Sequence, residues 1–120
     1  MPPWFWIVAL NVPAWPAAGL AGVHDTAGTI KSALARRPDL QVLIGHGSGS
    51  FGHTSAARHG TREGVKSRED WRGFLEVWRD ARELNHIVIE ILSEAGLPVI
   101  AFSPSATTLA TAGHVKAYAL

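Results

Sequence analysis

A short apolar run followed at once by a glycine-rich segment is the feature that most constrains the fold of this chain. Residues Leu40–Ile44 are apolar and branched, apart from one glutamine, and lie between Pro38 and Gly45. Their length and composition are typical of a buried β-strand. The glycine-rich turn Gly45–His53 comes next, and residues Thr54–Arg58 have the character of the start of a helix. A strand, a glycine turn and a helix in this order favour an α/β fold.

Two further helices are predicted, one on each side of this unit. Asp25 or Thr26 is placed to cap the first, whose apolar residues recur at helical spacing until it ends near Arg36. The second begins after Ser67, because Ser67 and Asp70 have the spacing of a capping box with Asp in place of Glu. Its apolar residues recur every three or four positions for several turns, which indicates a long amphipathic helix.

A second buried strand is predicted at Leu97–Phe102, and Ser103–Ser105 would form the turn after it. Helix, strand, glycine turn, helix and strand imply right-handed crossovers and a parallel sheet covered by helices. We therefore predict an α/β fold built on a parallel sheet. Residues 1–23 would form a divergent leader or edge strand, and residues 24–120 would form the domain.

Composition and charge exclude several classes of protein. The chain has 120 residues, enough for one domain, and its net charge of +1 argues against a nucleic-acid binder. It has no cysteine, which excludes disulfides, thiolate zinc sites and cysteine catalysis and favours the cytoplasm. The N-terminal apolar run ends at Asn11, before Pro13 and Pro16, so it predicts no membrane span. No Lys or Arg precedes Lys31, which argues against a secretory signal.

The glycine-rich turn is also the first candidate for a binding site. Its glycines let the backbone approach a ligand closely, and its N–H groups together with the next helix dipole attract phosphate. The segment lacks the Lys-Ser or Lys-Thr of a Walker loop, and His53 stands where a dinucleotide fingerprint requires its third glycine. Glycine-rich turns also serve merely as connections. From these residues alone, both an anion site and a structural turn therefore remain open.

Histidines and large apolar residues offer two further candidates. A zinc site from His46, His53 and His59 fits no usual ligand spacing, so no metal site is predicted. One face of the long helix carries four large apolar residues, Trp71, Phe74, Leu75 and Trp78. We expect most of this face to pack in the core, with the wall of an apolar ligand pocket as the alternative.

The glycine-rich segment resembles a known signature. His46–His53, with the sequence HGSGSFGH and preceded by Val42–Gly45, is similar to the motif of isopentenyl phosphate kinases, a branch of the amino-acid kinase superfamily. The similarity extends over about residues 30 to 115, through Leu84–Val88, Leu92, Ala95–Val99, Ser103–Ser105 and Gly113. The octapeptide is specific, because related kinases usually lack its Ser-Phe-Gly-His ending.

The resemblance implies ATP-dependent phosphorylation of isopentenyl phosphate to isopentenyl diphosphate, with Mg²⁺, in isoprenoid biosynthesis. The partner is then a small-molecule phosphomonoester. Carried over by position, Gly47, Ser48, Gly49 and Gly52 would bind the substrate phosphate, with Ser48 in place of a glycine common in the family. His53 would be catalytic and hydrogen-bond a phosphate oxygen. No nucleotide-binding residue is carried over.

Asn85 and the two ends of the chain complete the comparison with the family. Asn85 matches a recurrent Leu-Asn pair, which predicts a structural hydrogen bond near the substrate loop. The family opens with a strand carrying Lys, a hydrophobe and Gly-Gly-Ser, and Met1–Thr29 has no match to it. The chain has roughly half a family length, so the resemblance implies that residues 24–120 are the N-terminal, substrate-binding half of a parallel-sheet, three-layer αβα sandwich of the amino-acid kinase type.

Without that lysine strand and an ATP-binding half, we expect the chain alone not to turn over substrate. Strand edges left open by truncation predict a homodimer or poor solubility. Two alternatives stay open. One is another kinase of the superfamily that acts on a small carboxylate or carbamate, and the other is a non-catalytic phosphate-binding remnant.

Overall fold

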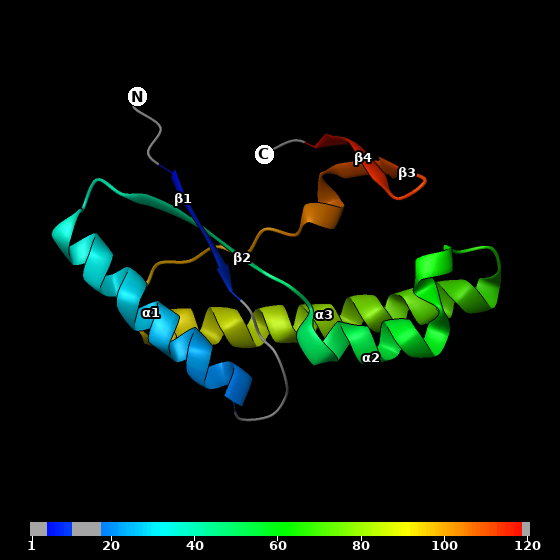
Figure 1. Ribbon diagram of the computed structural model, residues 1–120, viewed down its shortest axis with the longest axis horizontal. Helices are drawn as coiled ribbons and strands as arrows, with labels where there is room; N and C mark the ends of the chain where they lie inside the picture. Colours follow the sequence, from blue (N-terminus) through cyan, green and yellow to red (C-terminus); the bar gives the residue numbers. More distant parts are fainter. Residues whose placement is uncertain (1–4, 11–17, 119–120) are drawn as a thin grey trace.

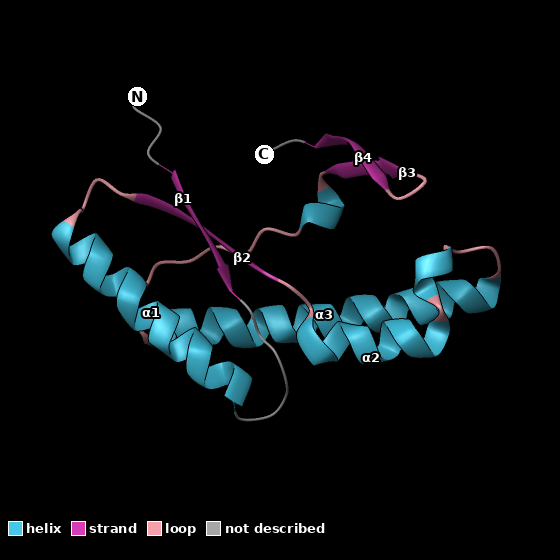
Figure 2. Cartoon of the chain, viewed as in Figure 1, coloured by secondary structure: helices cyan, strands magenta, loops and turns pink. Residues whose placement is uncertain are grey.

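The computed structural model describes residues 5–10 and 18–118, with only the backbone described for residues 5–10, 18 and 19. The elements in chain order are β1 (Phe5–Leu10), α1 (Ala18–Arg36), β2 (Gln41–His46), α2 (Gly49–His59), η1 (Thr61–Glu63), α3 (Arg68–Glu94), η2 (Pro104–Ala106), β3 (Thr108–Thr111) and β4 (His114–Tyr118). α2 lies along α3, the longest described helix, and α1 crosses α3 at an angle (Figure 1). The predicted α/β class is confirmed, because helices alternate with strands along the chain (Figure 2).

The sheet that carries the glycine-rich loop has two described strands. β1 and β2 pair in parallel, with the register running from Phe5 opposite Gln41 to Leu10 opposite His46. The carboxyl ends of both strands therefore lie side by side, next to the loop that follows His46. The other described sheet is the antiparallel β3–β4 hairpin.

The core lies between α1 and α3. Val23, Ala27 and Ile30 recur at helical spacing on α1, so one stripe of this helix faces inward. Among the residues whose side chains are described, the eight buried apolar ones are Val23, Ala27, Ile30, Leu84, Val88, Ile91, Leu92 and Leu97. Val42 and Ile44 of β2 pack against this cluster. The strand that precedes the glycine-rich loop is thereby fixed to the core.

α3 begins at the predicted capping box, which is confirmed. The Asp70 N–H donates to Ser67 Oγ at 3.1 Å, and the Ser67 N–H donates to Asp70 Oδ2 at 2.8 Å. The Lys66 N–H donates to the same carboxylate oxygen at 2.9 Å. This hydrogen bond from Lys66 and those of Ser67 hold the pKa of Asp70 below its ordinary value. The helix is thus fixed at its N-terminal end by satisfied backbone donors.

α2 is held against α3 by an ionic cluster and a close backbone approach. Glu76 of α3 pairs with Arg58 through Oε1, and its Oε2 lies 2.6 Å from His59 Nε2. Gly73, one turn earlier on α3, is buried directly under His59. A Cβ at position 73 would lie 2.6 Å from both Cβ and Cγ of His59. The glycine therefore lets the two helices touch where the cluster ties them.

Stability should depend on the Glu76 carboxylate at acid pH. The hydrogen bond from His59, followed by the charge of Arg58, lowers the pKa of Glu76 below its ordinary 4.5. Because the folded pKa is the lower one, the contribution is present above 4.5 and is lost as pH falls through the folded pKa. Thermal unfolding followed against pH should show Glu76→Gln less stable than the wild type near neutrality, with the difference shrinking on acidification. Exposed Glu90→Gln is the control, and a pH-independent difference would contradict the assignment.

The structure corrects three boundaries predicted from the sequence. α1 begins at Ala18 instead of Asp25 or Thr26. β2 runs on to His46 instead of ending at Ile44. α2 begins at Gly49 instead of Thr54, so only Gly47 and Ser48 of the predicted glycine turn lie between the strand and the helix. Helix propensity places glycines outside helices, but the tertiary packing of α2 on α3 overrides it here. Residues 11–17, part of the predicted leader, lie outside the described residues.

The predicted strand Leu97–Phe102 is wrong, since this segment has no regular secondary structure. Leu97 is buried, but Ile100 is 95% exposed and Phe102 is 52% exposed. Within the described chain no strand pairs with it, and an apolar run becomes a strand only beside a partner. The three-layer parallel sandwich is accordingly not seen among the described residues.

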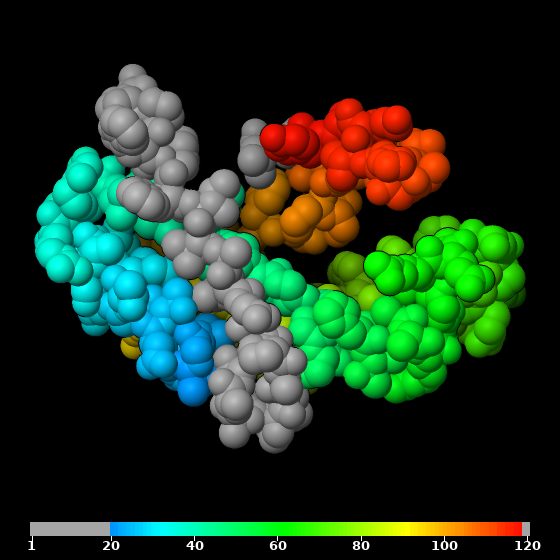
Figure 3. Space-filling model, in the orientation of Figure 1, coloured from blue at the N-terminus to red at the C-terminus, as the bar shows by residue number. Residues whose placement is uncertain are grey.

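The molecule is flat and leaves much surface uncovered. It measures 51 × 37 × 17 Å, and its radius of gyration of 16.3 Å exceeds the roughly 14 Å of a compact chain of this length. Its accessible surface of 9061 Å² exceeds the roughly 6,300 Å² expected for its mass. Figure 3 shows an open cleft between the β3–β4 hairpin and the ends of α2 and α3 near η1. Among the described helices, none is long and apolar enough to cross a membrane.

Candidate functional site

The predicted site lies at the carboxyl end of β2. Only Gly47 and Ser48 separate the last residue of β2, His46, from the first residue of α2, Gly49. Gly49 has a φ of +52°, a left-handed conformation that favours glycine. The chain thus passes from strand to helix in a very short turn. The N-terminus of α2, with its positive dipole end, then lies beside the strand terminus.

Ser48 and Gly52 form the inner side of this turn. The Gly52 N–H donates to the Ser48 carbonyl at 3.2 Å, so the helix already uses this amide. A Cβ at position 52 would lie 2.6 Å from Ser48 Cβ and 2.7 Å from its Oγ. Gly52 therefore leaves the room that the Ser48 side chain occupies. Ser48 makes no side-chain cap to the helix.

His53 lies one helical turn after Gly49 and is exposed. Residues four apart share a helix face, so His53 stands on the side of α2 that begins at Gly49. The first turn of α2 has no acidic residue, so no carboxylate of that turn offsets the positive end of the helix dipole. Gly47, Ser48, Gly49 and His53 are thus carried by one loop and the first turns of one helix.

Asn85 makes the hydrogen bond predicted for it. Its Nδ2 lies 2.9 Å from Nε2 of His46, and this contact joins the middle of α3 to the end of β2. The other ring nitrogen of His46, Nδ1, lies 3.0 Å from the Gly47 carbonyl oxygen. The sequence alone presents His46 only as a residue that flanks the glycine-rich loop or as a ligand in a zinc site. The motif itself could not reveal this pairing, because the two residues are 39 positions apart.

The apolar face of α3 is more exposed than predicted. Exposed fractions are 61% for Trp71, 46% for Phe74, 52% for Leu75 and 40% for Trp78. The prediction that most of this face packs in the core is therefore wrong. Trp71 and Phe74 pack edge to face, and the Arg82 guanidinium lies over the Trp78 ring. Helical periodicity reveals an apolar face without revealing what covers it.

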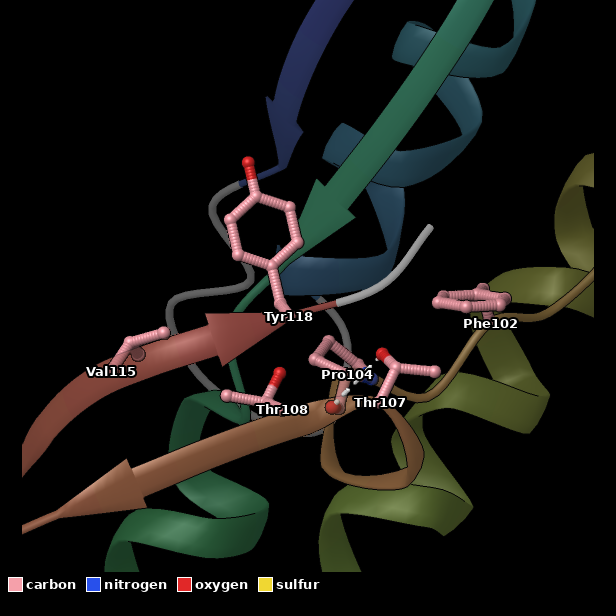
Figure 4. A pocket seen from close by; sticks show the side chains of 6 residues that line it. All are labelled: Phe102, Pro104, Thr107, Thr108, Val115 and Tyr118. Atoms are coloured by element: carbon pink, nitrogen blue, oxygen red, sulfur yellow. Dashed lines mark hydrogen bonds between the residues drawn. The ribbon is translucent and has the colours of Figure 1, made fainter.

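A separate hollow lies at the C-terminal hairpin. Figure 4 shows its six lining residues, which are Phe102, Pro104, Thr107, Thr108, Val115 and Tyr118. The Thr107 hydroxyl donates to the Pro104 carbonyl at 3.4 Å. None of these residues belongs to the predicted phosphate site. In the described part of the chain, no three His, Cys, Asp or Glu side chains gather where they could hold a metal ion.

A glycine loop between a parallel strand and a helix N-terminus defines the class. The chain has an α/β fold, and α/β proteins with open sheets bind ligands, as a class, at the carboxyl ends of their strands. Over 97 residues it is 30% identical to the isopentenyl phosphate kinase of Methanothermobacter thermautotrophicus, covering 78% of this chain and 36% of that protein. Over 82 residues it is 30% identical to the isopentenyl phosphate kinase of Methanocaldococcus jannaschii, covering 63% of this chain and 32% of that one.

A plant relative and a solved structure agree. Over 65 residues the chain is 32% identical to the isopentenyl phosphate kinase of Arabidopsis thaliana, covering 53% of this chain and 20% of that protein. A crystal structure described as isopentenyl phosphate kinase superposes with a TM-score of 0.79 and 28% identity, over 96% of this chain and half of that one. No protein-family model matches the chain.

The chain is therefore related to the isopentenyl phosphate kinases, as its glycine-rich motif predicts. It spans about a third of the length of the two archaeal relatives, and half of the solved chain.

Proposed function

We propose that this chain forms the substrate-binding part of an isopentenyl phosphate kinase. The observation that carries the proposal is the turn from β2 to α2, where the specific motif stands at the carboxyl end of a parallel strand. The relatives that share this region are isopentenyl phosphate kinases in both sequence and structure comparisons. The ligand would then be an isopentenyl phosphate, bound through its phosphate.

Each residue of the proposed site has a defined task. Backbone N–H groups of Gly47, Ser48 and Gly49 would donate to the phosphate, with the dipole of α2 adding to the attraction. Gly52 would serve this site by leaving room for Ser48. His53 would donate a hydrogen bond to a phosphate oxygen that does not react, and so orient the acceptor.

The reaction proposed needs no general base, because the acceptor is already a phosphate anion. A phosphate oxygen attacks the γ-phosphorus of ATP, a new O–P bond forms, and the bond from the γ-phosphorus to the bridging oxygen breaks to release ADP. Alignment and charge stabilisation supply the catalysis. ATP and Mg²⁺ belong to this reaction. The described residues show no cluster of metal ligands, so we assign none of them to Mg²⁺ and route no step through it.

The complete sheet architecture, the association of copies and the cellular location are also part of the proposal. The three-layer αβα sandwich would be completed by sheet and helix elements beyond those described here, with residues 24–120 supplying its substrate-binding half. Association of two copies in the cytoplasm also remains a proposal. The uncovered surface supports association of some kind, because its excess over a compact monomer is about the area that obligate interfaces bury.

The site is tested by titrating the chain with isopentenyl phosphate in a calorimeter. His53→Ala should weaken binding about tenfold or more, the effect of losing a hydrogen bond to a charged group. His114→Ala, an exposed histidine on the hairpin, is the matched control and should leave affinity unchanged. We expect no ADP release when the chain alone is mixed with ATP and isopentenyl phosphate. Equal affinity of His53→Ala and wild type, or preference for a simple carboxylate, would overturn the proposal.

A further inference from the structure

His46 connects the glycine loop to the helical core. Its Nδ1 lies 3.0 Å from the Gly47 carbonyl oxygen, and its Nε2 lies 2.9 Å from Asn85 Nδ2. A carbonyl oxygen can only accept, so Nδ1 must carry a hydrogen. In a neutral imidazole Nε2 is then the acceptor, and the Asn85 amide N–H donates to it. The two contacts together select the Nδ1–H tautomer.

Asn85 is well placed to impose this choice. It follows Leu84, which is 0% exposed, and it precedes Val88, which is 2% exposed, so the helix at this point is fixed in the core. With the opposite tautomer, the Nε2–H would face the N–H donor of Asn85, and Gly47 would lose its hydrogen bond from the ring. The amide therefore transmits the position of α3 to the start of the loop.

Gly47 needs such a restraint. Among the described residues, no atom beyond its chain neighbours lies within 4 Å of where its Cβ would be, so nothing packs on that side of the residue. A glycine without packing contacts has a wide choice of φ and ψ. The peptide unit is planar and trans, so the Gly47 carbonyl and the Ser48 N–H point in opposite directions. Holding that carbonyl toward His46 turns the Ser48 N–H away from the ring.

We propose that Asn85 is a positioning residue that fixes the His46 tautomer and, through the Gly47 carbonyl, aims the Ser48 N–H at the phosphate. The inference rests on the proposed function, because it gives the loop a phosphate to bind. Asn85 itself does not touch the ligand. It acts through two hydrogen bonds, and its removal should loosen the loop while the core stays folded.

The first experiment reads the tautomer directly. Long-range ¹H–¹⁵N NMR spectra of the imidazole rings, with His46 assigned by its loss in His46→Gln, should show the Nδ1–H form in the wild type. Asn85→Ala should shift His46 toward the Nε2–H form, which free histidine prefers, and displace the Ser48 amide resonance. Glu90→Ala, an exposed change on the same helix, should do neither. An Nε2–H ring in the wild type, or no shift in Asn85→Ala, would overturn the proposal.

The second experiment measures binding of inorganic phosphate and isopentenyl phosphate. Asn85→Ala should weaken both about three- to tenfold, the effect of losing one neutral hydrogen bond. Asn85→Asp keeps the shape but offers only acceptors, so it should draw the proton to Nε2 and weaken binding similarly. Melting curves must show both variants folded. Weaker binding without a tautomer change would refute the positioning role.

The two proposals can fail separately. If the wild type binds no phosphate but His46 has the Nδ1–H form and responds to Asn85→Ala, the proposed function fails, while the tautomer result supports the role of Asn85 in fixing the loop. If the wild type binds phosphate and Asn85→Ala binds equally well, only the positioning role fails.

Discussion

Replacing Leu84 by alanine should lower the free energy of unfolding by about 2–5 kcal/mol. Leu84 is fully buried, and it belongs to a cluster of only eight buried apolar residues. In so small a core, few neighbouring side chains can move to fill the space that alanine leaves. The loss therefore includes both the transfer of the deleted methyl and methine groups and the cavity they leave. Urea unfolding followed by far-UV circular dichroism measures it.

Leu109→Ala is the matched control for this experiment. Leu109 lies on β3 and is 63% exposed, so the same chemical deletion should change stability by less than about 0.5 kcal/mol. Similar losses from the two variants would mean that the core does not lie between α1 and α3. A small loss from Leu84→Ala alone would mean that its surroundings collapse onto the cavity.

Local signals in the sequence predict the elements that are stabilised by their own residues. The capping box at Ser67 and Asp70 satisfies backbone donors within four residues, so pattern alone locates the start of α3. The apolar run of the strand at Gln41–His46 and the glycines of the turn after it are also local signals, although the strand forms because β1 pairs with it. The relationship to isopentenyl phosphate kinases was also visible in this short segment.

Features that depend on distant partners escaped prediction. Residues 97–102 have a strand-like composition, yet Ile100 is almost fully exposed and no described strand pairs with the segment. The hairpin was missed because its turn, Ala112–Gly113, has positive φ at both residues but lacks the usual Asn-Gly signal. Gly113, with three threonines before it and Val115 and Tyr118 after it, was the available clue.

The candidate site divides in the same way. The motif predicts which residues form the loop, but not that Gly52 is buried against Ser48 or that His46 pairs with Asn85. The Gly52–Ser48 contact is made within the turn into α2, and the His46–Asn85 pair depends on how β2 packs against α3. α2 and α3 also meet directly, where Gly73 lies against His59.

Gly73→Ala should destabilise the protein by about 1–3 kcal/mol, although alanine is the better helix former. At an exposed position in the middle of a helix the same change would stabilise by about 1 kcal/mol. Here the new Cβ would lie 2.6 Å from Cβ and Cγ of His59, and Cβ cannot rotate away because it is bonded directly to the backbone of α2. The helices must separate, and the contacts of Glu76 with His59 and Arg58 then stretch.

A double-mutant cycle separates the clash from any other effect of the alanine. His59→Gly removes both facing atoms, so in that background Gly73→Ala should become neutral or stabilising by up to about 1 kcal/mol. Chemical denaturation of the four proteins gives the coupling between the two positions. If Gly73→Ala stabilises the wild type as it would an exposed helix, α2 and α3 do not touch at this point. The sign of that single change thus decides whether the packing that orients the first turn of α2, and with it His53, is the one described.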